Sequence, residues 1–181
     1  MRDVQSGRVH RQFVDRWSTR KFTADPLDSE DLKAIFEAAR WAPSSFNAQP
    51  WVIVHSTTAE ERDRIASVLN ERNAAWAAKA PHLAILFARK RFEHNDTPNP
   101  WAAFDSGAAW MSLALQAHLL GYSAHAMAGF DAVQAYEVSG VDPKVMDAMC
   151  VVAVGRPADT EEEPRSPRKD PASIIMKPAA S

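Results

Sequence analysis

The chain has 181 residues and a mass of 20.0 kDa, which is the size of a single domain. With 46% hydrophobic and 24% charged residues, it has the composition of a globular protein that buries a sizeable core. Its 21 Lys and Arg against 23 Asp and Glu give a net charge of -2, which excludes a global basic field for nucleic acid or an anionic membrane. Any anion-binding site must therefore be local.

The first half of the chain alternates helices with apolar strands. Residues 1–5 lack the apolar core of a secretion signal, and we expect a cytoplasmic protein. Asp28 begins a helix that ends before Pro43, with apolar residues at helical spacing between them. The next elements are two buried strands, at residues 51–54 and 83–88, and two helical segments between them, at residues 60–69 and 73–80.

A charged loop at residues 89–100, which we expect to be mobile, precedes the longest apolar segment of the chain. Residues 101–120 predict a helix that is apolar nearly all round. Such a helix should be buried on every side, in the core or against another subunit. Its Asp105, Gln116 and His118 and its many Ala residues argue against a membrane span.

The last third of the chain predicts strands at residues 123–127 and 146–154, with a short helix at 131–138 between them. The only cysteine, Cys150, cannot form an internal disulfide, and we expect a buried, inert thiol. Helices that alternate with continuously apolar strands predict an α/β or α+β sheet covered by helices on both faces. The charged tail at residues 158–181 carries a late apolar group, which indicates docking on the core or on a second copy.

Several chemistries lack their motifs. No Gly-x-Gly-x-x-Gly follows a strand, no phosphate-binding loop ends in Gly-Lys-Ser or Gly-Lys-Thr, and there is no Gly-x-Ser-x-Gly elbow. The six histidines never pair at metal-ligand spacing, so no metal site is expected. Hydrolase and metalloenzyme functions therefore lose most of their support.

Two segments have the residue types of a ligand site. In an extended Arg16-Trp17-Ser18-Thr19-Arg20, residues 16, 18 and 20 point the same way, and two guanidinium groups and a hydroxyl suit a phosphate. The alternative is the solvated basic end of an N-terminal helix. The uncharged segment at residues 42–50 carries hydroxyls and amides that suit the edge of a neutral heterocycle; the alternative is an ordinary Asx and Ser turn.

Five blocks in order along residues 16–171 resemble the nitroreductase family of FMN-dependent NAD(P)H oxidoreductases. They are Arg16-x-Ser18-x-Arg20-x-Phe22, Ala38-Ala39-Arg40-Trp41-Ala42-Pro43-Ser44-Ser45, Asn47-x-Gln49-Pro50-Trp51, Asp105-x-Gly107-Ala108-Ala109 through Leu115-x-Ala117, and Val154-Gly155 before a Pro and Arg tail. The resemblance implies a single α+β domain over residues 1–181, with a central mixed sheet, helices on both faces and an obligate homodimer.

The resemblance also implies the activity. FMN would be bound, NADH or NADPH would be a transient co-substrate, and small planar acceptors such as nitroaromatics or quinones would be reduced, with no nucleic-acid or membrane partner. A flavin reductase that supplies reduced flavin to a partner, or a non-catalytic flavin-binding sensor, is the alternative.

The resemblance assigns cofactor-binding roles to particular residues. On the phosphate and ribityl side these are Arg16, Ser18 and Arg20, the backbone of Trp17, and Arg168 from the tail, with Lys169 or Arg165 as alternates. On the isoalloxazine side they are Pro43, Ser44, Ser45 and Asn47 from the second subunit, Gln49 nearby, and Met127, Ala128 and Gly129, whose backbone N–H would face flavin N5. Family members often have an acidic residue at this last segment, and this chain lacks it.

Three features keep two interpretations. The small residues Gly107, Ala108, Ala109 and Ser112 suit either a close helix–helix dimer contact or core packing. Trp101 and Phe104 suit either the roof of a substrate pocket or a core anchor, and His125 suits either substrate orientation or a structural role.

Overall fold

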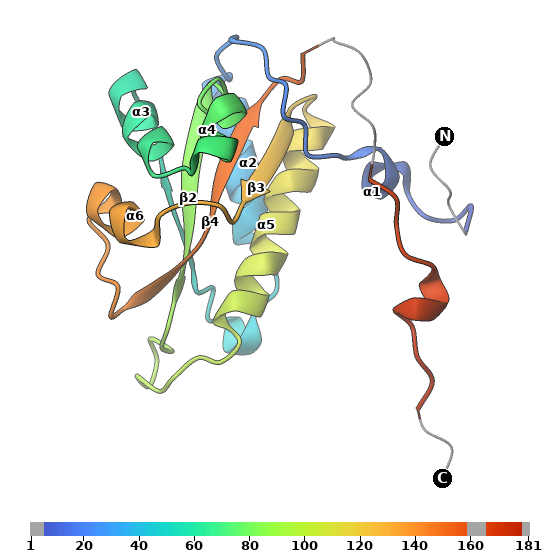
Figure 1. Cartoon of the computed structure of the whole chain (residues 1–181). Coiled ribbons are helices and arrows are strands. Elements are labelled where there is room, and N and C mark those ends of the chain that lie inside the picture. Colours follow the sequence, from blue (N-terminus) through green and yellow to red (C-terminus); the bar gives the residue numbers. More distant parts are fainter. Residues whose placement is uncertain (1–5, 159–165, 179–181) are drawn as a thin grey trace.

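A four-stranded sheet organises the chain in the computed structural model, which describes residues 6–158 and 166–178 (Figure 1). The strands are β1 (Trp51–His55), β2 (His82–Arg89), β3 (Ser123–Met127) and β4 (Met146–Gly155), and their spatial order is β1-β2-β4-β3. All three pairings are antiparallel, so the expectation of a mixed sheet is wrong for the described residues. The apolar runs predict each strand, but they carry no information on strand direction.

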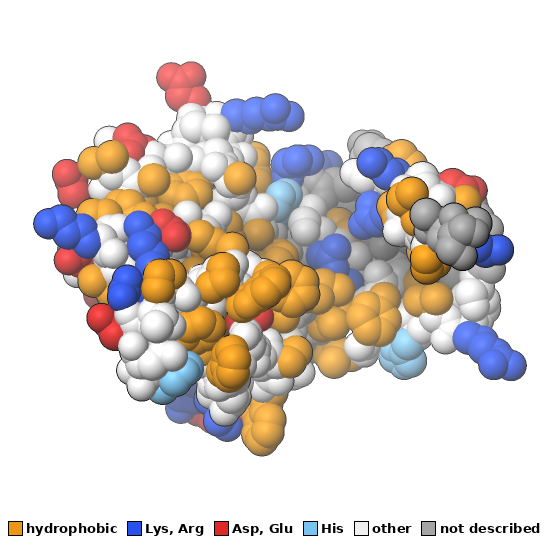
Figure 2. Space-filling view, turned by 90° about the horizontal axis from the view of Figure 1, so that it is seen from below, with side chains coloured by type: hydrophobic (Ala, Val, Ile, Leu, Met, Phe, Trp, Pro, Cys, Tyr) orange, Lys and Arg blue, Asp and Glu red, His pale blue; other side chains and the backbone are white. Residues whose placement is uncertain are grey.

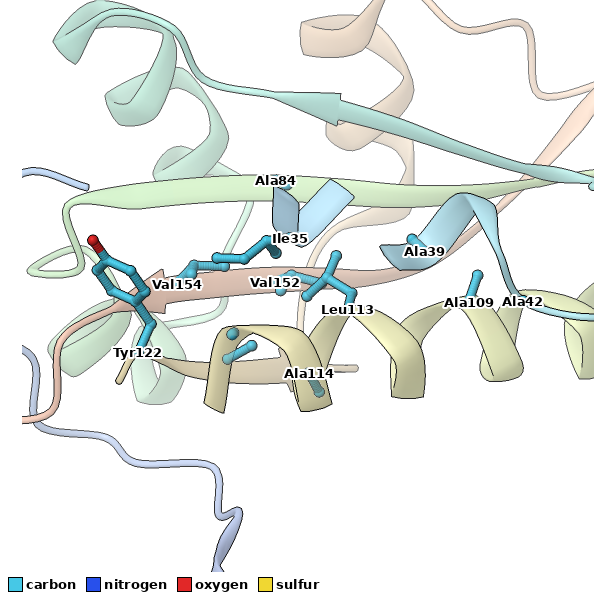
Figure 3. Close-up of a cluster of buried hydrophobic side chains, with 12 residues drawn as sticks. Ile35, Ala39, Ala42, Ala84, Ala109, Leu113, Ala114, Tyr122, Val152 and Val154 are labelled. Carbon is cyan, nitrogen blue, oxygen red and sulfur yellow. The ribbon is translucent and has the colours of Figure 1, made fainter. Parts of the chain in front are cut away.

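Helices cover both faces of the sheet, as expected. The helices are α1 (Arg11–Asp15), α2 (Ser29–Arg40), α3 (Ala59–Ser67), α4 (Glu71–Ala77), α5 (Ala102–Leu119) and α6 (Ala132–Ser139), with short 3-10 turns η1 (Ser45–Asn47) and η2 (Pro171–Ser173). On one face α2 and α5 pack on Ala84 and Val152 (Figure 3). On the other face α3, α4 and α6 pack on Leu83 and Val151. Alternate residues of β2 and β4 therefore serve two cores, which explains why these strands are apolar over most of their length.

Local capping explains where several helices begin. The Asp28 carboxylate accepts from the N–H groups of Glu30 and Asp31, and Thr58 and Glu61 form a capping box at α3.

The strand β1 is half-buried rather than buried, because it lies at the edge of the sheet and pairs only with β2. The predicted element types are confirmed.

The helix α5 is not buried on every side within one chain. Ala109 is 0% exposed and points towards α2 and the sheet, so this member of the small-residue group belongs to the core (Figure 3). Phe104 is 78% exposed, and Met111 and Leu119 are exposed as well. The apolar composition of α5 thus divides into a core face and a face open to solvent. None of the helices in the described part of the chain combines the length and hydropathy of a membrane span.

The segment before α2 is joined to the segment that follows β4. The Thr23 N–H donates to the Arg156 carbonyl at 3.0 Å, and the Ala158 N–H donates to the Lys21 carbonyl at 3.0 Å. Phe22 and Pro157 form an antiparallel bridge between these bonds. Beyond this junction, α1 and the described tail lie away from the sheet (Figure 1).

Candidate functional site

The basic segment at residues 16–20 is extended. The helix α1 ends at Asp15, and Arg16 has φ -56° and ψ 131°. The Arg16 Nη1 donates to Ser18 Oγ at 3.3 Å, so the structure brings these two predicted phosphate ligands together. The Arg20 guanidinium lies over the Trp76 ring, 6.0 Å from its centroid. The segment is therefore not the last turn of a helix.

The strand β3 anchors this segment. The Ser123 Oγ donates to the Trp17 carbonyl at 2.8 Å, and the Thr19 N–H donates to Ser123 Oγ at 3.4 Å. The His125 Nδ1 lies 2.9 Å from the Thr19 carbonyl, and its ring packs on Trp76 with the centroids 4.6 Å apart. His125 thus has the structural role, and the Trp17 carbonyl is fixed by Ser123, whereas a contact of the Trp17 backbone with FMN stays a prediction.

The uncharged segment is a strained loop. Phe46, Asn47 and Gln49 have φ of 53°, 54° and 46°, the left-handed region that side chains other than Gly rarely adopt. Such residues cost of order 1 kcal/mol or more each and cluster at functional sites. This conformation is more than an ordinary Asx and Ser turn needs, and it favours a ligand-binding role for the loop.

Hydrogen bonds hold this loop in place. The Ser45 N–H donates to Asp105 Oδ2 at 3.0 Å, and Asp105 is 3% exposed in the first turn of α5. The Gln49 N–H donates to Ser44 Oγ at 2.9 Å, and the Gln49 side chain donates to the Asn47 carbonyl at 3.1 Å. Asn47, Gln49 and Pro43 remain exposed, so the loop presents them outward.

The segment Met127-Ala128-Gly129 continues from β3 to the loop before α6. The Gly129 carbonyl accepts from the Asn70 N–H at 3.1 Å and from Asn73 Nδ2 at 2.9 Å. A Cβ at Gly129 would lie 2.4 Å from Asn70 Nδ2, so glycine permits this close approach. Met127 is buried and Ala128 is exposed. Asn70 and Asn73 thus fix the backbone at the end of the segment.

The described tail makes few side-chain contacts. The Arg168 Nη1 donates to the Ser166 carbonyl at 3.2 Å, and Arg168 and Lys169 are exposed. Arg165 lies outside the described residues. Ile174, Ile175 and Met176 are also exposed, so these apolar residues are not packed on the core of their own chain. Docking of the tail on a second copy stays a prediction, as does the role of Arg168.

The predicted site divides between the two ends of α5. Residues 17 and 19 bond to Ser123, just beyond the C-terminal end of α5, whereas Ser45 bonds to Asp105 in its first turn. A helix of this length spans about 27 Å at about 1.5 Å per residue. Figure 1 shows η1 at one end of α5 and the N-terminal segment passing its other end. One chain alone therefore does not bring the two halves together.

Exposed apolar side chains gather near the first turn of α5. Figure 2 views the molecule from this end and shows many hydrophobic side chains on the face. Phe46, Trp101 and Phe104 are exposed residues of this region of the chain. Phe104 is thus no core anchor, and a role as the roof of a pocket remains open to it.

Burial shifts two ionisable groups outside this site. Cys150 is half-buried rather than fully buried as expected, yet burial raises the pKa of its thiol to about 12, in keeping with the inert thiol expected from the sequence. Burial and the neighbouring His55 lower the pKa of His82 to about 4. No group of three or more metal-ligating side chains occurs in the part of the chain that the structure describes.

Sequence reasoning missed the residues that support the site. Asp105 reaches the loop across 60 positions, Asn73 reaches Gly129 across 56, and Trp76 lies against Arg20. Only Asp105 carried a signal, because it stands in the Asp105-x-Gly107 block.

The structure is therefore an α+β domain with two open half-sites. One is the basic segment at residues 16–20, and the other is the strained loop at residues 43–49. The nitroreductase family model matches residues 14–79 and 68–156, and the chain belongs to the nitroreductase family, whose members are oxidoreductases.

Relatives and solved structures agree with this membership. A protein of Streptomyces coelicolor with the provisional name NADH dehydrogenase/NAD(P)H nitroreductase is 31% identical over an alignment of 182 positions, which covers 86% of this chain and 86% of that protein. The crystal structure of an oxidoreductase containing FMN superposes with a TM-score of 0.90 and 34% identity, covering 98% of this chain and 95% of that chain. A Desulfovibrio desulfuricans protein in complex with FMN shares the fold, with a TM-score of 0.77, 23% identity and coverage of 98% and 100%. The family and the class of enzyme expected from the sequence are confirmed.

Proposed function

We propose that the chain is a homodimeric, FMN-dependent oxidoreductase that transfers two electrons from NADH or NADPH to small planar acceptors such as nitroaromatics and quinones. For a quinone, NAD(P)H, one proton and the quinone give NAD(P)+ and the hydroquinone. The names of the relatives support the nicotinamide, and the FMN-containing structure at 34% identity supports the flavin.

The placement of the two half-sites at opposite ends of α5 carries the proposal. A second copy would bring the loop at residues 43–49 of one chain beside residues 16–20 of the other. The exposed apolar residues Phe104, Met111 and Leu119 on α5 would be covered by the same association, which removes apolar surface from water. The site is incomplete without this second copy.

The residues present fit the parts of FMN. Arg16 and Ser18 meet at 3.3 Å and offer charged and neutral donors to a phosphate, and Trp76 supports Arg20 beside them. The loop at residues 43–49 and the backbone at residues 127–129 offer amide donors and acceptors to a heterocycle. When bound, FMN would supply the two-electron chemistry of the reaction.

The other task of the chain is to hold its own groups in position. Asp105 fixes the Ser45 peptide, and Asn70 and Asn73 fix the Gly129 peptide. Fixing these two peptides also holds the neighbouring backbone groups in place, and polar groups that are already oriented need no reorganisation when charge develops beside them. The Met127-Ala128-Gly129 segment lacks the acidic side chain that family members often have there, so in this chain only backbone groups of the segment would contact the flavin.

Flavin binding by arginine variants tests the proposal. Arg16→Ala and Arg20→Ala should each weaken FMN by roughly 10- to 100-fold, or roughly 1.5 to 3 kcal/mol, because each removes a charge-assisted hydrogen bond. Arg8→Ala, an exposed arginine of the same N-terminal segment, is the matched control. Full flavin occupancy of both variants after dilution and desalting would contradict the phosphate assignment.

Turnover separates the enzyme from its alternatives. The purified dimer should oxidise NADH or NADPH in the presence of a quinone or a nitroarene. A rate that depends on added free flavin, with no reduction of quinones, would favour the flavin reductase instead, and flavin binding with no oxidation of either nucleotide would favour the sensor.

A further inference from the structure

An open hollow of about 350 Å³ lies between the strained loop and the loop at residues 89–100. Its walls are Phe46, Asn47, Ala48, Glu93 and His94. Asn47 belongs to the proposed flavin shell, so a molecule in this hollow would lie directly beside that shell.

The ring of Phe46 is held on the protein surface at a conformational cost. Phe46 is 80% exposed although its φ is 53°, so neither burial nor relaxed backbone geometry accounts for its position. Its ring packs edge-on against Phe92, with centroids 5.6 Å apart, and lies 6.0 Å from the His94 ring. Phe46 and His94 thus present two aromatic surfaces at the hollow.

The opposite loop is preformed. The Phe92 N–H donates to the Thr97 carbonyl at 2.8 Å, and Arg91 pairs with Asp96 at 2.7 Å. The Glu93 carboxylate pairs with Arg89 Nε at 3.1 Å, which leaves further acceptor capacity on its oxygens. Charged side chains thus brace the loop at residues 89–100 from within, whereas its expected mobility stays a prediction.

The chemistry of the walls selects a ligand class. Aromatic surfaces attract a flat ring, and the Glu93 carboxylate attracts a hydrogen-bond donor and repels an anion. We propose that the hollow is the ring-binding subsite of the electron acceptor and takes a planar aromatic ring that carries an N–H or O–H donor. This inference rests on the proposed function and adds the residues that select the acceptor.

Equilibrium binding to the oxidised holoprotein, without nicotinamide, tests the subsite. The probes are 4-nitroaniline, which has a donor, and 4-nitrobenzoate, which is an anion. Phe46→Leu and His94→Leu should each weaken 4-nitroaniline binding by about 3- to 10-fold, because each removes one ring surface. Phe46→Tyr should retain the affinity, and Trp41→Leu is the control for loss of an exposed aromatic residue.

The Glu93→Gln variant tests the selection of the donor. The ratio of the affinities for 4-nitroaniline and 4-nitrobenzoate should fall by about 3-fold, because the variant no longer repels the anion. The effect is small because water screens an exposed charge. An unchanged preference would overturn the role of Glu93.

The outcomes separate this inference from the proposed function. Wild-type protein that holds FMN, together with unchanged affinities in Phe46→Leu and His94→Leu, would overturn the subsite alone. If Phe46→Leu and His94→Leu raise the KM for NADH but leave 4-nitroaniline binding unchanged, the hollow binds the adenine ring of the nicotinamide nucleotide, and the acceptor assignment is overturned. Wild-type protein that holds no FMN would overturn both.

Discussion

Acidification should destabilise the protein through His82. This side chain is 6% exposed at the start of β2, and its Nε2 is buried without a hydrogen-bond partner in the described part of the chain. The rings of Phe36 and His55 lie 5.9 and 5.3 Å from it, centroid to centroid. Burial first, and the neighbouring His55 second, lower its pKa from 6.5 to about 4.

The sign follows from proton binding. Between the folded and unfolded pKa values the unfolded chain binds more protons at this residue, so the free energy of unfolding rises with pH through that window. The contribution is fully present above the unfolded value of 6.5 and is lost as the pH falls to about 4. The lowered pKa of His82 contributes about 3 kcal/mol in total to this pH dependence of the free energy of unfolding. Of this, about 2 kcal/mol should be lost between about pH 7.5 and about pH 5.

Urea unfolding at a series of pH values between these limits measures the effect. The wild-type free energy of unfolding should fall by about 2 kcal/mol, and His82→Leu should remove most of this slope, because leucine does not titrate. His10→Asn is the control, since His10 is exposed and Asn keeps a cap acceptor for α1. A His82→Leu protein with the wild-type slope would refute the reasoning.

The remaining predictions concern the loop tether and the face of α5. Asp105→Ala should weaken FMN by about 10-fold in a fluorescence titration, because the Ser45 N–H loses its charged acceptor, whereas Asp105→Asn should lose less. Equal losses would contradict the tether. Met111→Glu should shift the proposed dimer to monomer in light scattering, and a variant that stays dimeric at micromolar concentration would contradict that interface. Ala109→Glu should instead prevent folding, because an unpaired carboxylate in the core costs several kcal/mol.

The elements that the sequence predicts correctly are those with local causes. Asp28 caps α2 through its own neighbours, and the apolar runs of β2 and β4 reflect burial on two faces. Each signal lies within a few residues of the structure that it determines. The types of these elements were therefore accessible from the chain alone, and their bounds to within about three residues.

The missed features depend on distant partners. Strand direction is set by pairings such as that of Leu83 with Ala153, which no local pattern records. The open face of α5 has the same apolar composition as its core face, so composition alone did not separate Met111 from Ala109. The left-handed backbone at Phe46 could not be predicted, because no glycine occupies that position. These features appear only once the fold is assembled.

The junction between residues 21–23 and 156–158 has a consequence for the order of folding. Its bonds close a loop that holds most of the chain, and residues 17 and 19 dock on Ser123. Closing so long a loop costs chain entropy before any contact repays it. During synthesis, residues 17–23 must wait until β4 has emerged before they reach their place. The segment that carries Arg16 and Arg20 should therefore be among the last parts of the domain to acquire its native contacts, so a nascent chain becomes competent to bind an anion there only after β4 has been made.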